Sequence, residues 1–340
     1  MHRIERLANL EVHVTRGQTV ESRHLVDAVV VDSKGQVVTV YGNEQALVFP
    51  RSSIKMLQAV SLVESGAIEK FSLSQAHLAI ASSSHWGDEK HTSLVGAWLN
   101  QLSLEIEDLV CHPHEPYDEK TRRQLIRSGQ PSSRLHNNCS GKHTGLLCTC
   151  LMLKENFKFY EKWDHFIQIR LRKVLSELAG IDMEKAPWGV DGCGIPTYAV
   201  PLDSLATAFS ALLLDRAWSP DRLAALKAIQ AAVITEPHLI AGESAFCTDM
   251  IRGSRGKVVV KTGAEGVYCG ACLNTGFAFA LKVKDGATRA SELAAAILLQ
   301  RLGGLSPEDV VSLARHTRPV IHNWEGKIVG KRFVPEQELA

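Results

Sequence analysis

The sequence RSSIKMLQAVSLVESG, residues 51–66, places a serine and a lysine three positions apart at the start of a helical segment. Residues three apart lie on one face of a helix, so the Lys55 amine can reach the Ser52 hydroxyl. A lysine kept neutral by burial or by a nearby cation can accept the serine proton and create a nucleophile. Gly66 marks the end of the helix. A second Ser-x-x-Lys, beginning at Ser254, lies among glycines where no helix aligns its side chains, so it predicts no such site.

Another lysine follows much later, where Lys261-Thr262-Gly263 closes a predicted strand. A Ser-x-x-Lys on a helix with a Lys-Thr-Gly on a later strand is the pattern of β-lactamases and penicillin-binding proteins, in which the strand lysine adds positive charge beside the nucleophile. Taken alone, Lys261 would be a surface lysine at a strand end, but the helical pair favours the functional interpretation. The serine run at residues 82–84 can supply a second hydroxyl, although spacing does not select one of the three.

The apolar pattern predicts strands at both ends of the chain and helices between them. Alternation predicts strands at residues 10–15, 28–31, 37–41, 257–261 and 275–283, with a hairpin turn at Asp32–Gly35. Helical spacing predicts helices over residues 91–102, 163–178 and 289–302. We therefore predict an α/β (α+β) fold, in which one antiparallel sheet is assembled from both chain ends beside a helical subregion. Residues 1–340 are predicted to form a single catalytic domain.

Bulk properties exclude several classes of protein. The formal net charge is +1 and the basic residues are scattered, so nothing indicates a nucleic-acid partner. The N-terminus is charged where an export signal needs an apolar segment, and no apolar stretch is long enough to cross a bilayer. Eight cysteines in 340 residues are too few for a disulfide scaffold. We expect a cytoplasmic protein without a membrane partner.

Two cysteines stand in polar or glycine-rich surroundings. Cys139 precedes a predicted helix, and Cys193 lies about fifty residues later beside Asp191. Two thiolates with a further ligand can hold Zn²⁺, but this spacing matches no standard zinc finger, and on spacing alone two buried free cysteines are the better interpretation. Cys269 and Cys272 form a single Cys-x-x-Cys, which we interpret as structural thiols in a tight turn.

Five short blocks occur in an order that one enzyme family shares. They are Arg51–Lys55, Ala81–His85, Asn137–His143, Asp191–Gly194 and Lys261–Val267. With these blocks the sequence resembles the rhizobial-type, or thermolabile, L-asparaginases from about Glu11 to about Gly330. The resemblance implies a serine β-lactamase-like fold, a homodimer, and the conversion of L-asparagine to L-aspartate and ammonia.

The resemblance also implies roles for individual residues. It implies two catalytic serine–lysine pairs, Ser52 with Lys55 and Ser84 with Lys261. It implies substrate contacts by Arg51, His85 and Gly263. It implies one zinc ion per chain beside the substrate, held by Cys139, Lys142 and Cys193, with Asp191 as an outer partner. On this basis Lys55 takes the proton of Ser52, while Ser84 and Lys261 relay a proton to the departing ammonia, although the sequence does not decide which serine attacks.

Two departures from the family pattern bear on specificity. Met56 follows the motif lysine where the family often has proline, and Trp86 stands in a loop that commonly reads Ser-Gly-Glu. Trp86 can reshape the pocket, so hydrolysis is better defined than an exclusive preference for asparagine. Two alternatives stay open: another serine hydrolase of the same fold, such as a peptidase or esterase, and a non-enzymatic sensor that binds metal or an amino acid.

Overall fold

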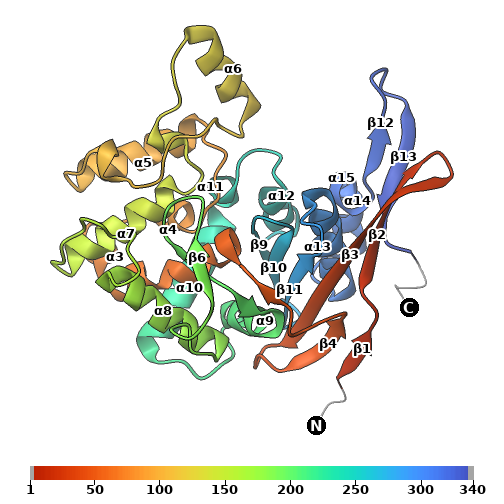
Figure 1. The fold of residues 1–340 in the computed structure, drawn as a ribbon, viewed down its shortest axis with the longest axis horizontal. Coiled ribbons are helices and arrows are strands. Elements are labelled where there is room, and N and C mark those ends of the chain that lie inside the picture. Colours follow the sequence, from red (N-terminus) through yellow and green to blue (C-terminus); the bar gives the residue numbers. More distant parts are fainter. Residues whose placement is uncertain (1–3, 336–340) are drawn as a thin grey trace.

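The computed structural model describes residues 4–335 and contains a large sheet built from both ends of the chain (Figure 1). The strand order is β12-β13-β2-β3-β11-β10-β9, and β4 also pairs with β3 and carries β1 on its other edge. These strands are β1 (Glu5–Leu7), β2 (Leu10–Arg16), β3 (Thr19–Asp32), β4 (Val37–Tyr41), β9 (Val258–Thr262), β10 (Val267–Cys272), β11 (Phe277–Val283), β12 (Val320–His322) and β13 (Ile328–Phe333). Every pair is antiparallel except β1 with β4. The predicted fold class is therefore confirmed.

Strand β3 joins the two chain ends into one sheet. One of its edges pairs with β2 and then β4, and the other pairs with β11 along residues 26–32. Strands β9 to β11 are buried along nearly their whole length, as expected for strands covered on both faces. Helices α9 (Leu202–Phe209) and α13 (Thr288–Arg301) pack against them. The end of β9 is thereby fixed beside the helical region, which is where Lys261 lies.

The helical region fills the middle of the sequence (Figure 1). Its longer helices are α4 (Gln75–Ala81), α5 (Glu89–Gln101), α6 (Glu119–Ser128), α7 (Ser140–Met152), α8 (Phe166–Ala179), α10 (Pro220–Thr235) and α12 (Phe246–Gly253). The short ones are α1 (Lys55–Gln58), α2 (Val60–Glu64), α3 (Ala67–Lys70), α11 (Pro237–Ile240), α14 (Pro307–Ser312) and α15 (Ala314–Thr317), with 3₁₀ turns at Arg51–Ile54, Ile106–Asp108, Arg134–His136 and Ser210–Leu213. The predicted helices near 91–102, 163–178 and 289–302 are confirmed as α5, α8 and α13.

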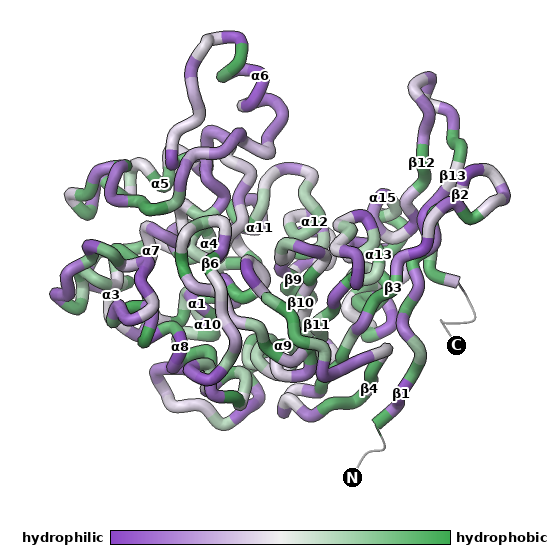
Figure 2. The backbone as a smooth tube through the Cα atoms, in the orientation of Figure 1, coloured by the Kyte–Doolittle hydropathy of each residue, from purple (hydrophilic) through white to green (hydrophobic). Residues whose placement is uncertain are grey.

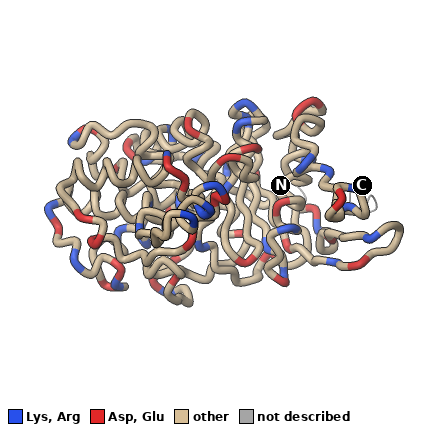
Figure 3. Tube along the Cα trace, turned by 90° about the horizontal axis from the view of Figure 1, so that it is seen from above, with Lys and Arg blue, Asp and Glu red and all other residues tan. Residues whose placement is uncertain are grey.

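Two further pairs of short strands lie among these helices. They are β5 (Leu47–Val48) with β8 (Val200–Pro201), and β6 (Trp188–Val190) with β7 (Pro196–Tyr198). Helix α6 projects from the helical region, is mostly hydrophilic and has no buried side chain (Figure 2). Acidic and basic residues are interspersed along the chain (Figure 3). Within residues 4–335, no helix combines the length and the apolar character that crossing a membrane requires.

The segment between β9 and β11 corrects one prediction. Cys269 and Cys272 do not lie in a turn but in β10, a central strand paired with both neighbours, and both thiols are fully buried. Small residues are needed there because the Phe279 ring lies across the strand: a Cβ on Gly270 would come within 2.4 Å of Phe279 Cε1. The same small residues that suggested a turn in the sequence are thus a packing requirement of the sheet.

Candidate active site

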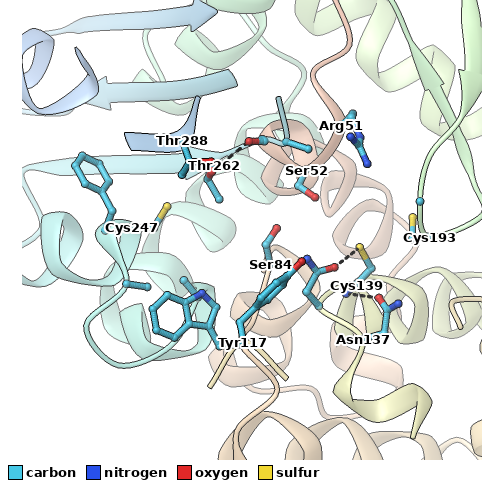
Figure 4. A pocket seen from close by; sticks show the side chains of 18 of the residues that line it. Arg51, Ser52, Ser84, Tyr117, Asn137, Cys139, Cys193, Cys247, Thr262 and Thr288 are labelled. Atoms are coloured by element: carbon cyan, nitrogen blue, oxygen red, sulfur yellow. Dashed lines mark hydrogen bonds between the residues drawn. The ribbon is translucent and has the colours of Figure 1, made fainter. Parts of the chain in front are cut away.

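A cavity of about 480 Å³ opens between the helical region and the end of β9 (Figure 4). Its walls include two serines, two cysteines and an arginine from segments far apart in the sequence: Ser52, Ser84, Cys139, Cys193 and Arg51. Both serine hydroxyls point into this cavity (Figure 4). The structure therefore brings the predicted serines and cysteines together around one space.

The two lysines of the predicted pairs meet at a single serine. Lys55 Nζ donates to Ser84 Oγ over 3.1 Å, and Lys261 Nζ donates to the same oxygen over 2.7 Å. Lys55 also donates to the carbonyl oxygens of Ser83 and Asn138, at 2.6 and 3.2 Å. Both lysines are almost wholly buried, at 1% and 0% exposed. Ser84 is thus held between two amines at the floor of the cavity.

Burial and the neighbouring charge act together on Lys261. Removal of the side chain from water, followed by the positive charge of Lys55, lowers the pKa of Lys261 to about 7. A neutral amine is a base, whereas an ammonium is only a donor. Near neutral pH Lys261 can therefore accept a proton from the Ser84 hydroxyl.

Ser52 lies at the start of the helical segment but does not bond Lys55. Its hydroxyl faces the cavity and hydrogen-bonds to no residue within 4–335, while Lys55 turns inward to Ser84. The expected Ser52–Lys55 contact is absent because the Lys55 amine instead donates to Ser84 and to the carbonyl oxygens of Ser83 and Asn138. The preceding residue, Arg51, has a left-handed φ of 48°, which is strained for a side chain of this size.

Arg51 faces the glycine-rich loop on the other wall. Its Nε donates to Asp191 Oδ1 over 2.6 Å, which leaves its terminal nitrogens at the cavity. Burial alone would raise the pKa of Asp191, but the charges of Lys142 and Arg51 outweigh it and hold that pKa below its usual range. The Arg51 guanidinium is therefore fixed in orientation and can receive a carboxylate.

The cysteines and Lys142 form a second buried polar group beside the serines. Lys142 Nζ donates to Cys193 Sγ over 3.0 Å, and the Cys139 sulfur lies 3.1 Å from Asn138 Oδ1. A hydrogen bond from Cys139, with the charge of Lys142, outweighs burial and lowers the pKa of Cys193 to about 5. Cys193 is therefore a thiolate at neutral pH, next to a thiol and an ammonium.

Gly263 lies where the end of β9 passes the start of the Ser52 segment. A Cβ at this position would come within 2.6 Å of the Pro50 carbonyl oxygen and 3.3 Å of Ser53 Cβ. The Lys-Thr-Gly sequence thus ends in glycine because the strand and the helical segment approach too closely for a side chain. The close approach brings the end of β9, which carries Lys261, next to the segment that carries Ser52.

His85 is the predicted site residue that the structure places elsewhere. Ser84 and Trp86 donate their backbone N–H groups to Ile240 and Ala241, so they face the cavity while His85 points the opposite way. Its ring is fully buried, and its Nε2 lies 2.9 Å from Ser140 Oγ. The proposed contact of His85 with substrate is therefore not supported.

Behind His85 lies a stack of rings that sequence reasoning missed. His85 stacks on His91 and His91 on His238, each at 5.0 Å between ring centroids. Asp88 lies 2.7 Å from a nitrogen of both His91 and His238 and caps α5. This stack ties the Ser84 loop to α5 and α11, and the Asp88–His91 spacing on one helix was its only sequence signal.

The comparisons with known proteins identify the family. The chain is matched from residue 12 to residue 333 by the family model of L-asparaginase II. The chain belongs to the L-asparaginase II family. This membership makes it an amidohydrolase, an L-asparaginase, and sets aside the sensor and the other serine hydrolases that the sequence left open. A comparison with curated proteins finds no match.

Solved structures similar to this L-asparaginase include beta-lactamases and a penicillin-binding protein homologue. One is a provisionally assigned beta-lactamase from Bacteroides dorei DSM 17855, with 12% identity, a TM-score of 0.40, and coverage of 81% of this chain and 84% of the other. Another is a class C beta-lactamase mutant, with 13% identity, a TM-score of 0.37, and coverage of 85% and 92%. A third is an octameric penicillin-binding protein homologue from Pyrococcus abyssi, with 12% identity, a TM-score of 0.31, and coverage of 81% and 73%.

Proposed function

We propose that this L-asparaginase cleaves the asparagine side-chain amide with Ser52 as nucleophile and with Ser84 and Lys261 as a proton relay. The observation that carries the proposal is the Ser84 hydroxyl, which lies within 3.1 Å of both lysine amines. A hydroxyl held in this way can pass a proton to a neutral Lys261. Ser52, whose hydroxyl is unengaged and faces the cavity, is free to attack.

The proposed reaction transfers protons along the series Ser52, Ser84 and Lys261. As Ser52 Oγ attacks the amide carbon, its proton passes to Ser84 and the Ser84 proton passes to Lys261. Lys55, which donates to Ser84 Oγ, stabilises negative charge on the Ser84 oxygen. Lys261 then returns the proton through Ser84 to the nitrogen, the C–N bond breaks, and ammonia leaves. Water hydrolyses the acyl-enzyme by the same relay and releases L-aspartate.

Arg51 is the proposed anchor for the substrate. Its guanidinium is held by Asp191, and its terminal nitrogens can donate two hydrogen bonds to the α-carboxylate of asparagine. Gly263, at the cavity wall beside Ser52, is proposed to contact the substrate through its backbone. Binding at Arg51 would fix the distance from the α-carboxylate to the reacting carbonyl.

We further propose one zinc ion per chain, held by Cys139, Lys142 and Cys193. The donor set fits: Cys193 is a thiolate in contact with Lys142, sulfur and nitrogen are preferred zinc ligands, and zinc would bind as Cys139 and Lys142 each release a proton. Asp191 would be an outer partner, because within residues 4–335 only Asp88, His91 and His238 bring three imidazole, thiol or carboxylate ligand atoms within 4.8 Å of one another. When bound, zinc would add positive charge beside the substrate and help to orient it.

A homodimer in the cytoplasm completes the proposal. Leu47, Phe49 and Val190 are 60%, 42% and 70% exposed and line a surface hollow next to Arg51. Apolar side chains gathered on a surface are typical of protein contacts, and a second copy of the chain is the proposed occupant. Light scattering tests this proposal, which fails if the mass in solution is that of one chain.

The decisive experiment compares Ser52→Ala and Ser84→Ala in ammonia release from L-asparagine, with circular dichroism as the control for folding. Ser52→Ala is expected to abolish turnover and leave no acyl-enzyme in denaturing mass spectrometry. Ser84→Ala is expected to slow acylation about 10²–10⁴-fold, the range of general acid–base catalysis. Normal turnover by a folded Ser52→Ala variant would refute the proposal.

A further inference from the structure

The cavity extends beyond what asparagine needs. Its volume of about 480 Å³ lies within the ~300–1,000 Å³ of pockets that enclose drug-sized ligands, whereas asparagine is a small amino acid. Arg51, Cys139 and Cys193 lie on one side of the two serines, and Cys247 and Thr288 on the other (Figure 4). The proposed substrate contacts occupy only the first side, which leaves the second without an assigned role.

This second side, which we call the aromatic arm, consists of Trp86, Ala245, Phe246, Cys247, Tyr268 and Thr288. Phe246 and Tyr268 pack edge to face with ring centroids 5.2 Å apart, and the Cys247 sulfur lies 3.4 Å from the Tyr268 hydroxyl. Phe246, Cys247 and Tyr268 are at most 3% exposed. These three residues form a part of the arm that is built into the core.

Trp86 closes one side of the arm and is fixed by its backbone. Its N–H donates to the Ala241 carbonyl over 2.6 Å, and its own carbonyl accepts from Asp118 N over 3.0 Å. The small side chains of Ala241 and Ala245 line the same cavity. An aromatic wall facing small residues leaves room for a flat apolar group.

The chemistry of the reaction directs one substituent into the arm. With the α-carboxylate at Arg51 and the amide carbon at Ser52, the amide nitrogen and oxygen point away from Arg51. Any group on that nitrogen then extends toward Cys247 and Thr288. We propose that this enzyme also hydrolyses N4-substituted L-asparagines whose amide nitrogen bears an uncharged, apolar, ring-sized group.

The charge pattern of the arm selects against an anionic substituent. Of the described residues that line the cavity, the only lysine or arginine is Arg51, at the opposite side. Glu292 also lines the cavity, and burial raises its pKa and favours an uncharged carboxyl group. A carboxylate on the departing amine would therefore lose water there with no lysine or arginine among the described lining residues of the arm to pair with it.

The reaction is the same hydrolysis with a larger leaving group, and it rests on the proposed function. Ser52 Oγ bonds to the amide carbon, the C–N bond breaks, and the relay gives one proton to the primary amine that departs. Water then adds to the acyl-enzyme to give L-aspartate. No oxidant, reductant or second substrate is required.

Two substrates that differ by one carboxylate test the proposal. N4-(2-phenylethyl)-L-asparagine releases 2-phenylethylamine, whereas β-L-aspartyl-L-phenylalanine releases the same skeleton with a carboxylate. Chromatography of the released amine should show that the wild-type enzyme cleaves the first with a kcat/KM at least about tenfold above that of the second. Asparagine hydrolysis is measured in parallel as ammonia.

Thr288→Trp is the matched steric test, with Thr288→Ser as its control. Thr288 is exposed, begins α13 and lies outside the residues proposed to act on asparagine. Tryptophan there should fill the outer arm and reduce cleavage of the phenylethyl substrate at least about tenfold, while asparagine turnover changes less than about twofold. Thr288→Ser should behave like the wild type with both substrates.

Failure of the aromatic-arm proposal and failure of the proposed function would give different experimental results. An enzyme that hydrolyses asparagine but neither larger amide refutes the arm and leaves the proposed function intact. Equal cleavage of both larger amides, or an equal loss with asparagine and the phenylethyl substrate in Thr288→Trp, also refutes it. A folded wild-type enzyme that releases no ammonia from asparagine refutes the proposed function itself. The wild-type comparison decides the proposal even if Thr288→Trp does not fold.

Discussion

Lys261 and Lys142 each contact a residue that lines the cavity, Ser84 and Cys193, and are almost equally buried, at 0% and 4% exposed. Their pKa values nevertheless shift in opposite directions. Burial and the adjacent Lys55 lower the pKa of Lys261 to about 7. Burial acts the same way on Lys142, but Cys193, Cys139 and Asp191 outweigh it and raise its pKa above the ordinary value. The charge of the neighbours, rather than burial, therefore decides which lysine is a base and which is a cation.

The largest expected loss of asparaginase activity comes from removing Lys261, the proposed base. Lys261→Met keeps an apolar side chain of similar length but has no group to accept the Ser84 proton, so kcat/KM for asparagine should fall about 10²–10⁴-fold. Ammonia release measures the loss. Lys257→Met is the control, because Lys257 lies just before the same strand and forms an ion pair with Asp309, outside the cavity. A similar loss in the control would mean that the effect is structural.

The other lysine can be tested through the metal that it is proposed to bind. Protein purified without chelator in zinc-containing medium should carry about one zinc per chain, and Cys193→Ala should carry almost none, since it loses the thiolate. Elemental analysis measures both. Cys148→Ala, which removes a buried thiol from the same helix as Lys142, should keep its zinc. A wild-type protein without zinc, or equal losses in the two variants, would contradict the metal site.

The sequence predicted the sheet from both chain ends and the regions that meet at the cavity, because alternation and short motifs are local signals. It missed β10 because the small residues Cys269, Gly270 and Cys272 are typical of a turn. Only the structure shows that they are small because the Phe279 ring packs across the strand. It also predicted that His85 contacts the substrate. The direction in which the side chains of residues 84–86 point depends on backbone hydrogen bonds to Ile240 and Ala241, which a local sequence pattern does not reveal.

The active site also depends on tertiary contacts that local sequence patterns do not encode. Ser52 and Lys55 are three residues apart, so the sequence paired them, but the tertiary fold turns Lys55 toward Ser84. A pKa of about 7 for Lys261 depends on a neighbour about two hundred positions away, which no local pattern encodes. The single-domain organisation, the zinc ion and the homodimer stay predictions.

The smallest expected effect is a shift in the pH profile, and it tests the charge argument directly. Asparagine hydrolysis by the wild type should rise as Lys261 loses its proton, with an ascending limb near pH 7. The positive charge of Lys55 lowers the pKa of Lys261, so Lys55→Met should raise that pKa and move the limb to higher pH. Lys55→Arg keeps the charge and should leave the limb near its wild-type position. The readout is the position of the limb rather than the height of the plateau, because both variants lose the Lys55–Ser84 hydrogen bond and turn over more slowly. A limb that stays in place in Lys55→Met, or moves equally in both variants, would show that the charge of Lys55 does not tune the base.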